Sequence, residues 1–209
     1  MCAPTRLLIL WAIALAGPVM GSVARRQNEV AAASAAAAAA AATPEYEFIP
    51  SPGMPSLESL GLSAADLFNK TWVDELFKDT PNPVATTSNN GTFSASWVAS
   101  CDRDSRDLAP VNAIRACAAY LWALNRQACV GKNHPVQFVK MREGNYHAVV
   151  HGISVRSGPA TSYCRDCASP VYWVADHCVA GCDPPCVAGG SEAAYGNGDL
   201  IMVVSGNFS

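Results

Sequence analysis

The chain has 209 residues with 14 basic and 17 acidic side chains, which gives a formal net charge of −3. This balance provides no overall positive charge for a polyanion, so the sequence predicts no nucleic-acid partner. Half of the residues are hydrophobic, but no apolar segment reaches the roughly 18 residues of a membrane-spanning helix, so we expect no stable membrane insertion.

The N-terminus has the features of a secretory leader. Arg6 provides a positive charge, residues 7–16 (LLILWAIALA) form an apolar core, and small residues follow at Gly21 and Ala24. A short apolar core that ends in small residues is typical of a leader that is cleaved during secretion. The sequence therefore predicts a signal peptide over residues 1–24 and a secreted, extracellular protein.

Residues 25–96 are predicted to form a low-complexity extension ahead of the folded domain. Residues 31–42 are alanines and one serine, and residues 43–55 carry four prolines. An alanine run has no amphipathic face with which to pack, and a proline-rich segment is typical of a linker. We therefore expect the extension to be largely unstructured.

One short amphipathic helix is predicted within the extension, over residues 63–79. Ser63 can cap its first turn, and large apolar side chains recur every four residues on one face, at Phe68, Trp72 and Leu76. Such a helix cannot form a core alone, so it must pack on the C-terminal domain, on a partner or on a membrane surface. A removable propeptide and a flexible extension with a transient helix both remain open.

The extension also carries two sequons for N-glycosylation. They begin at Asn69 and Asn90, and each matches the pattern Asn-X-Ser/Thr. Both asparagines are therefore predicted to carry glycans, which makes the chain a glycoprotein of the secretory pathway. A third match at Asn207 lies at the extreme C-terminus and is left unassigned.

A cysteine-rich domain is predicted over residues 97–209. Eight of the nine cysteines lie here, and an even, clustered set behind a secretory leader is typical of a disulfide framework. The apolar spacing of residues 111–124 predicts a helix. Residues 136–141 and 146–155 are rich in β-branched and aromatic residues, and the Glu-Gly-Asn turn between them predicts a hairpin.

A second helix is predicted over residues 163–178, and a final strand over residues 199–205. Pro170 falls inside the helical pattern, so the helix is either kinked there or begins there with Ser169 as its cap. The order of elements predicts an α+β fold, in which a disulfide-stapled antiparallel sheet carries two helices on one face as an α/β sandwich. We expect this domain to be a monomer.

Three segments of the domain carry a family resemblance: VKMREGNYHAVV, CRDCASPVYWVADHCVAGC and VAGGSEAAYGNGDLIMVV. They resemble the virally encoded fungal killer toxins of the killer-protein-four type, and the resemblance extends over residues 101–205. Cys167 and Cys178 keep the spacing of the family, although the family's arginine here follows Cys164. The toxins have a central hairpin in which a lysine precedes a Gly-Asn turn, and a glycine-rich turn before the last strand.

The departures from the family concern one disulfide. The toxins have ten cysteines and this domain has eight, because Arg142 replaces one cysteine and its expected partner at the C-terminus is also missing. Sequence alone leaves the pairing of the remaining cysteines open. The resemblance implies the pairs Cys101–Cys178, Cys117–Cys167, Cys129–Cys164 and Cys182–Cys186.

The resemblance implies a secreted, non-catalytic toxin or fungal effector that acts on a target-cell surface protein or ion channel by blocking calcium channels. Lys140 matches the functional lysine of the family, and Arg142 is the second candidate for target binding. Alternation along the strand places Lys140 and Phe138 on the face opposite Val139 and Met141. If Val139 and Met141 face the core, Lys140 is exposed.

Other functions remain open. A small secreted hydrolase, either a nuclease or a wall-active enzyme, would use His147 or His177. Asp166, Asp176 and Glu192 provide acid–base groups, as side chains of almost any domain do. A necrosis-inducing effector of the plant–host interface has a similar cysteine and glycine pattern, and a structural or immunity role is also open.

Two cysteines fit the spacing of a reactive or metal-binding motif. Cys164 and Cys167 are separated as in redox enzymes and zinc sites, but structural disulfides are expected in an oxidising compartment. We therefore predict no catalytic residue, no metal and no cofactor.

Overall fold

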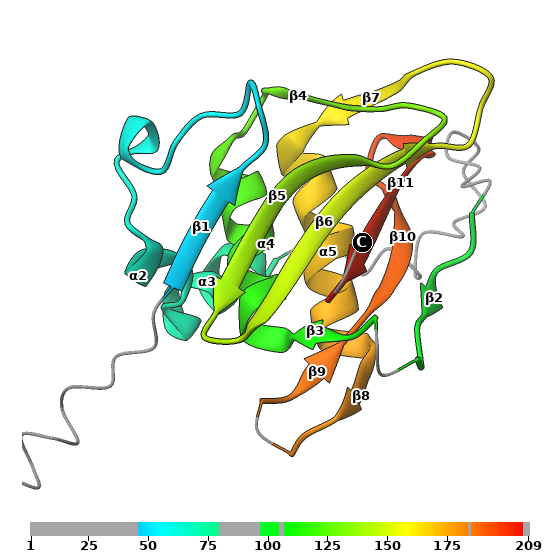
Figure 1. Ribbon diagram of the computed structural model, residues 1–209. Coiled ribbons are helices and arrows are strands. Elements are labelled where there is room, and N and C mark those ends of the chain that lie inside the picture. Colours follow the sequence, from blue (N-terminus) through cyan, green and yellow to red (C-terminus); the bar gives the residue numbers. More distant parts are fainter. Residues whose placement is uncertain (1–45, 80–96, 105–106, 184, 207–209) are drawn as a thin grey trace, which may run out of the picture. The chain divides into compact units, whose positions relative to one another are not determined.

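The computed structural model describes residues 46–79, 97–104, 107–183 and 185–206, and Figure 1 shows the arrangement of the elements. The predicted signal peptide, the alanine run, Asn90 and Asn207 lie outside the described residues. No helix in the described part of the chain combines the length and the apolar character needed to cross a bilayer.

The centre of the fold is an antiparallel sheet of six strands in the order β1-β5-β6-β11-β10-β2 (Figure 1). The strands are β1 (Tyr46–Pro50), β2 (Ser100–Cys101), β5 (Val136–Glu143), β6 (Tyr146–Ser154), β10 (Gly190–Ala194) and β11 (Asn197–Ser205). β5 and β6 form the predicted hairpin, and Gly144 in its turn has a φ of 59°, which favours glycine. β11 contains the predicted last strand and pairs with β6.

Two long helices cover one face of this sheet, so the predicted α+β sandwich is confirmed (Figure 1). They are α4 (Val111–Ala123) and α5 (Cys164–His177). α5 begins at Cys164 with Tyr163 as its N-cap and continues through Pro170, so a start at Pro170 is wrong. The buried sides of both helices and the facing side of the sheet form one hydrophobic core, whose largest fully buried side chains include Tyr120, Ile114, Met141, Leu200 and Met202.

A β-bulge in β5 changes which side chains face this core. The register with β6 shifts between Gln137 and Val139, so Phe138 is buried together with Val139 instead of pointing away from it. Gly152 on β6 makes room for the ring, because a Cβ at this position would lie 2.5 Å from Phe138 Cε2. Simple alternation therefore placed Phe138 on the wrong face.

Two smaller sheets and three disulfides flank the sandwich. One sheet has the order β3-β9-β8 and the other pairs β4 with β7. Their strands are β3 (Ala109–Pro110), β4 (Ala128–Gly131), β7 (Ala160–Tyr163), β8 (Val179–Gly181) and β9 (Val187–Ala188). The disulfides are Cys101–Cys178, Cys129–Cys164 and Cys182–Cys186, and the first two fix both ends of α5.

One part of the extension differs from its prediction, because residues 46–79 fold onto the domain. β1 is an edge strand paired with β5, and it is followed by η1 (Glu58–Leu60), α2 (Ala64–Leu67) and α3 (Lys70–Phe77). The Phe48 ring lies 4.6 Å from the Tyr120 ring, and the Tyr120 hydroxyl donates a hydrogen bond to the Pro55 carbonyl at 2.8 Å. A proline-rich segment thus contributes to the core because an existing strand edge supplies its hydrogen-bond partners.

The single helix predicted over residues 63–79 is two helices. Ser63 caps the start of α2, as the sequence suggested, and forms a capping box with Asp66. Asn69 then caps α3, because its side-chain oxygen accepts a hydrogen bond from the Trp72 backbone N–H at 3.2 Å. The second cap ends one helix and begins another, and periodicity alone does not show this break.

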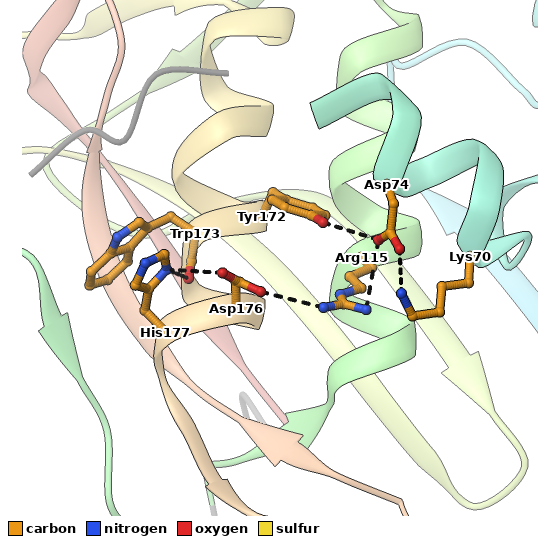
Figure 2. A network of polar contacts seen from close by, with 7 residues as sticks. All are labelled: Lys70, Asp74, Arg115, Tyr172, Trp173, Asp176 and His177. Carbon is orange, nitrogen blue, oxygen red and sulfur yellow. Dashed lines mark hydrogen bonds and ion pairs between the residues drawn. The ribbon is translucent and has the colours of Figure 1, made fainter. Parts of the chain in front are cut away.

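α3 is held against α4 and α5 by a network of polar contacts (Figure 2). Asp74 on α3 pairs with Lys70 and accepts a hydrogen bond from the Tyr172 hydroxyl at 3.1 Å. Arg115 on α4 lies 3.9 Å from Asp74 and 3.6 Å from Asp176 on α5. The network therefore joins the extension to both helices of the domain.

Candidate functional site

Lys140 lies in β5, on the face away from the helices. Its neighbours along the strand, Val139 and Met141, are fully buried in the core, whereas Lys140 itself is half-buried. Across the sheet it is opposite Ile49 on β1 and Val149 on β6. The aliphatic part of the lysine is therefore flanked by apolar side chains, which leaves its ammonium group at the surface.

Arg142 is exposed on the same face but is already engaged. Its Nη1 lies 3.4 Å from the Glu47 carboxylate on β1, and its Nε donates a hydrogen bond to the Gly144 carbonyl at 3.0 Å. The extension thus supplies an acid that reduces the positive charge beside Lys140. Of the two residues predicted to bind a target, Lys140 is therefore the stronger candidate.

The cysteines follow the expected pairing at three pairs and depart from it at the fourth. Cys117 on α4 and Cys167 on α5 are both buried free thiols, so the disulfide implied for them by the resemblance is not formed. The Cys117 sulfur instead makes a hydrogen bond with the Met141 backbone, which directs it toward β5. Burial raises the pKa of both thiols, so neither has the thiolate character of a redox or zinc-binding cysteine.

The histidines named for catalysis lie apart from one another. His177 ends α5, where its ring stacks on Trp173 and its Nδ1 lies 3.6 Å from an Asp176 oxygen (Figure 2). His147 lies on β6 opposite Arg142. His151 is buried further along β6, and its burial lowers its pKa. No group of three metal-binding side chains occurs among the residues that the structure describes.

A different site is built at the beginning of α5, where Pro170 has a structural consequence. Proline has no backbone N–H, so Pro170 cannot donate to the carbonyl of Asp166 one turn earlier. That carbonyl instead accepts a hydrogen bond from the Tyr195 backbone N–H at 3.1 Å. The proline inside the helix thereby creates the docking point for the turn between β10 and β11.

This turn and its surroundings are firmly held. The Ser162 hydroxyl donates to the Tyr195 carbonyl at 2.7 Å, and the Asn197 side chain donates to the Thr161 carbonyl at 2.8 Å. Gly196 between them has a φ of 73°, a conformation that favours glycine. The Cys129–Cys164 disulfide fixes the residue that immediately precedes Arg165 and Asp166.

Two hollows share Asp166, and we call their combined lining the Asp166 site. The first has a volume of about 410 Å³ and is lined by Leu76, Asp79, Trp122, Arg165, Asp166, Ser169 and Tyr195. The second has a volume of about 350 Å³ and is lined by Ala128, Thr161, Ser162, Tyr163, Asp166 and Gly196. Both volumes lie in the range of roughly 300–1,000 Å³ that is common for sites of small ligands.

The Asp166 site combines aromatic surface with groups of both charges. The Arg165 guanidinium lies 4.1 Å from the centre of the Trp122 ring, a cation–π contact that orients both side chains. Partial burial raises the pKa of the Asp166 carboxyl, and Arg165 beside it acts in the opposite direction. The arrangement can therefore offer donors, acceptors and flat apolar surface to one ligand.

The sequence indicated Asp166 only as one of several acid–base groups, and it did not indicate the other lining residues as a site. Leu76 and Trp122 were assigned to apolar helix faces, and Arg165 was considered only for its position beside a cysteine. The available signal was Pro170 inside a helix, since it frees the carbonyl one turn earlier. The partner of that carbonyl, Tyr195, could be found only from the tertiary structure.

Glu192 on β10 is a buried acid close to this site. It lies opposite Met202 on the helix-facing side of the sheet and is only 7% exposed. Burial raises the pKa of Glu192 to about 7. The pKa of Tyr195 is raised by its own burial and, to a smaller extent, by the charge of Glu192. A group of this kind makes stability depend on pH near neutrality.

Residues 97–206 match the family described as "Domain of unknown function (DUF8794)". None of the curated proteins and none of the solved structures matches the chain. The match begins where the sequence predicted the cysteine-rich domain to begin, and it includes the whole Asp166 site except Leu76 and Asp79. Because the match covers more than half of the 209 residues, the chain belongs to the DUF8794 family.

Proposed function

We propose that the chain is a secreted, non-catalytic protein of the toxin or effector type, which binds a molecule on the surface of a target cell. The observation that carries this proposal is the position of Lys140, which stands half-exposed on a strand whose opposite side is fixed in the core. The leader in the sequence and three disulfides support an extracellular location. Asn69 is exposed and accessible for glycosylation.

Blocking of a calcium channel is the specific form of this proposal that follows from the resemblance to the killer toxins. The entrance of a cation channel is lined by acidic groups, which attract a positive charge and can be obstructed by it. Lys140 can supply that charge, because the nearby Arg142 is paired with Glu47. The target would then be an ion channel or another acidic surface protein.

Treatment of sensitive fungal or plant cells with the purified protein tests this proposal. At micromolar concentration we expect slower growth and lower calcium uptake. Lys140→Gln should weaken both effects at least about tenfold, while the free energy of unfolding changes by less than about 0.5 kcal/mol, as is usual for surface substitutions. The matched control is Lys132→Gln, which removes the same charge from an exposed position between β4 and β5 and should keep full activity.

Two outcomes would decide against the proposal or its site. If the unsubstituted protein leaves growth and calcium uptake unchanged, channel blocking is rejected. If a folded Lys140→Gln variant keeps full activity, Lys140 is not part of the binding surface. Cell death in plant tissue without a change in calcium uptake would instead favour a necrosis-inducing effector.

A small secreted hydrolase is the second candidate, and the close approach of His177 to Asp176 is the observation that favours it. An imidazole beside a carboxylate can act as a general base. Turnover of a nucleic acid or a wall polysaccharide that is lost in His177→Ala or His147→Ala would replace the binding proposal. Turnover that both variants retain would point to a contaminating enzyme.

A further inference from the structure

We propose that the Asp166 site binds a neutral oligosaccharide, and that residues 46–79 complete this site. The proposal does not depend on a toxin or effector function, because it concerns a different surface from that of Lys140. It rests on the shape, the chemistry and the charge balance of the two hollows that meet at Asp166.

The site is preorganised for binding. The Cys129–Cys164 disulfide and the hydrogen bond from the Arg165 backbone N–H to the Asn125 carbonyl, at 3.1 Å, fix the start of α5. The turn that carries Tyr195 and Gly196 is tied to α5 on one side and to β7 on the other. A site that is already ordered loses little conformational entropy when a ligand binds.

The lining suits the two kinds of surface on a sugar ring. A pyranose has an apolar C–H face and a rim of hydroxyl groups, so it is bound by aromatic side chains together with strong hydrogen-bonding groups. Trp122 contributes an aromatic surface to the first hollow and Tyr163, which is 53% exposed, to the second. The Asp166 carboxylate lines both hollows and can accept hydrogen bonds from hydroxyl groups.

The charge balance favours a neutral ligand. Arg165 is the only cation among the described lining residues, and it is accompanied by Asp166 and Asp79. Two carboxylates oppose an anionic ligand such as a phosphate, whereas Arg165 reduces the attraction of these carboxylates for a cationic ligand. An apolar ligand would desolvate all three charges without giving them partners, which is unfavourable. A neutral polyhydroxylated ligand satisfies the three charged groups together.

The two hollows favour an oligomer over a single sugar. Asp166 lines both of them, and their volumes are about 410 Å³ and about 350 Å³. A chain of sugars can occupy both while Asp166 contacts hydroxyl groups of adjoining units. A monosaccharide would use only one hollow and make fewer contacts.

The extension supplies one wall of the first hollow. Leu76 lies on α3 and Asp79 follows its C-terminal end, and both precede the family match at residue 97. Phe77 holds this wall in place, because its ring stacks on Tyr172 of α5 at 4.3 Å. We therefore expect the extension to contribute to affinity in addition to the part of the chain shared with the family.

Isothermal titration of the purified full chain with four hexasaccharides tests the proposal. Two probes are neutral, a β-linked glucose hexamer and a chitin hexamer; one is the cationic glucosamine hexamer and one is the anionic galacturonate hexamer. We expect binding of a neutral hexamer that Asp166→Ala weakens at least about tenfold and Asp79→Ala at least about threefold. Lys140→Gln should bind as the unsubstituted protein does.

Asp183→Ala is the matched control, because it removes an exposed aspartate from the loop between β8 and β9. It should retain full affinity, and an unchanged melting temperature should show that each variant is folded. Binding of no neutral hexamer, preference for a charged hexamer, or full affinity in Asp166→Ala would overturn the site. Full affinity in Asp79→Ala alone would overturn the contribution of the extension.

Discussion

At the scale of single residues, a half-buried lysine and a buried acid have the clearest consequences, one for binding and the other for stability. Lys140 keeps its charge at the surface because its neighbours along β5 are in the core. Glu192 faces the helices instead and is 7% exposed, with a pKa raised to about 7 by burial. The first residue is suited to binding, whereas the second affects stability.

Glu192 leads to a prediction about pH. Its pKa is about 7 in the folded chain and 4.5 for a glutamate in water, so between these values the folded chain holds a proton that the unfolded chain has lost. The stability that the protonated Glu192 carboxyl contributes to the folded chain is fully present below about pH 4.5, and it is lost as the pH rises through about 7. Glu192→Gln keeps the shape without the charge, so at pH 8 it should be more stable than the parent by up to about 3 kcal/mol.

Urea unfolding at pH 5 and pH 8 would measure this effect. The advantage of Glu192→Gln over the parent should be large at pH 8 and small at pH 5, and comparing the two proteins cancels the other titrating groups. An equal difference at both pH values would show that the carboxyl does not titrate in this range in the folded chain.

At the scale of elements, residues 46–79 of the extension are part of the folded unit. Phe77 on α3 is 4% exposed and lies between Tyr172, at 4.3 Å, and Trp122, at 5.1 Å. Such rings in a core contribute both burial and aromatic contacts. The extension is thus joined to α4 and α5 by packing as well as by the polar network of Figure 2.

Phe77→Ala tests this integration. Removal of a buried phenylalanine typically costs about 3 kcal/mol or more, so we expect the free energy of unfolding in urea to fall by about that amount. Glu75→Ala on the exposed side of α3 breaks only a surface pair with Lys78 and should change stability by less than about 0.5 kcal/mol. If Phe77→Ala is as stable as the parent, the extension does not fold with the domain.

At the scale of the whole molecule, disulfides and core packing together fix α5. Disulfides hold its two ends, and the helix also packs on α4, where Cys117 and Cys167 are free thiols. Apolar packing therefore holds α4 and α5 together at the place where a fourth disulfide was expected. The thiols behave there as small hydrophobic side chains.

Alkylation of the purified protein with iodoacetamide, followed by mass spectrometry, would count these thiols. Cys2 lies in the predicted leader, so in denaturant without reductant we expect two modified residues, Cys117 and Cys167. In the folded protein neither should react, because burial raises the pKa of both thiols and excludes the reagent. Reduced protein provides the control with eight modified residues. Absence of any reactive thiol in denaturant would mean that these two cysteines are bridged.

The fold class, the two long helices, the central hairpin and the last strand could all be predicted from the amino-acid sequence. Local spacing is enough for these elements, because each has a clear apolar period or turn signal. Lys140 could also be placed, since alternation along β5 holds from Val139 to Met141. The face predicted for Phe138 by alternation is wrong, because a β-bulge shifts the register there and the local sequence gives no sign of this bulge.

The packing of residues 46–79 on the domain and the composition of the Asp166 site could not be predicted from the sequence and depend on the tertiary fold. β1 is too short and too rich in proline at its end to be recognised locally, and it forms because β5 offers an unpaired edge. Asp79, Trp122 and Tyr195 are far apart in the chain and meet only when α3, α4 and the last turn pack around α5. A sequence pattern records which face of an element is buried, but which elements share a hollow depends on packing between distant segments.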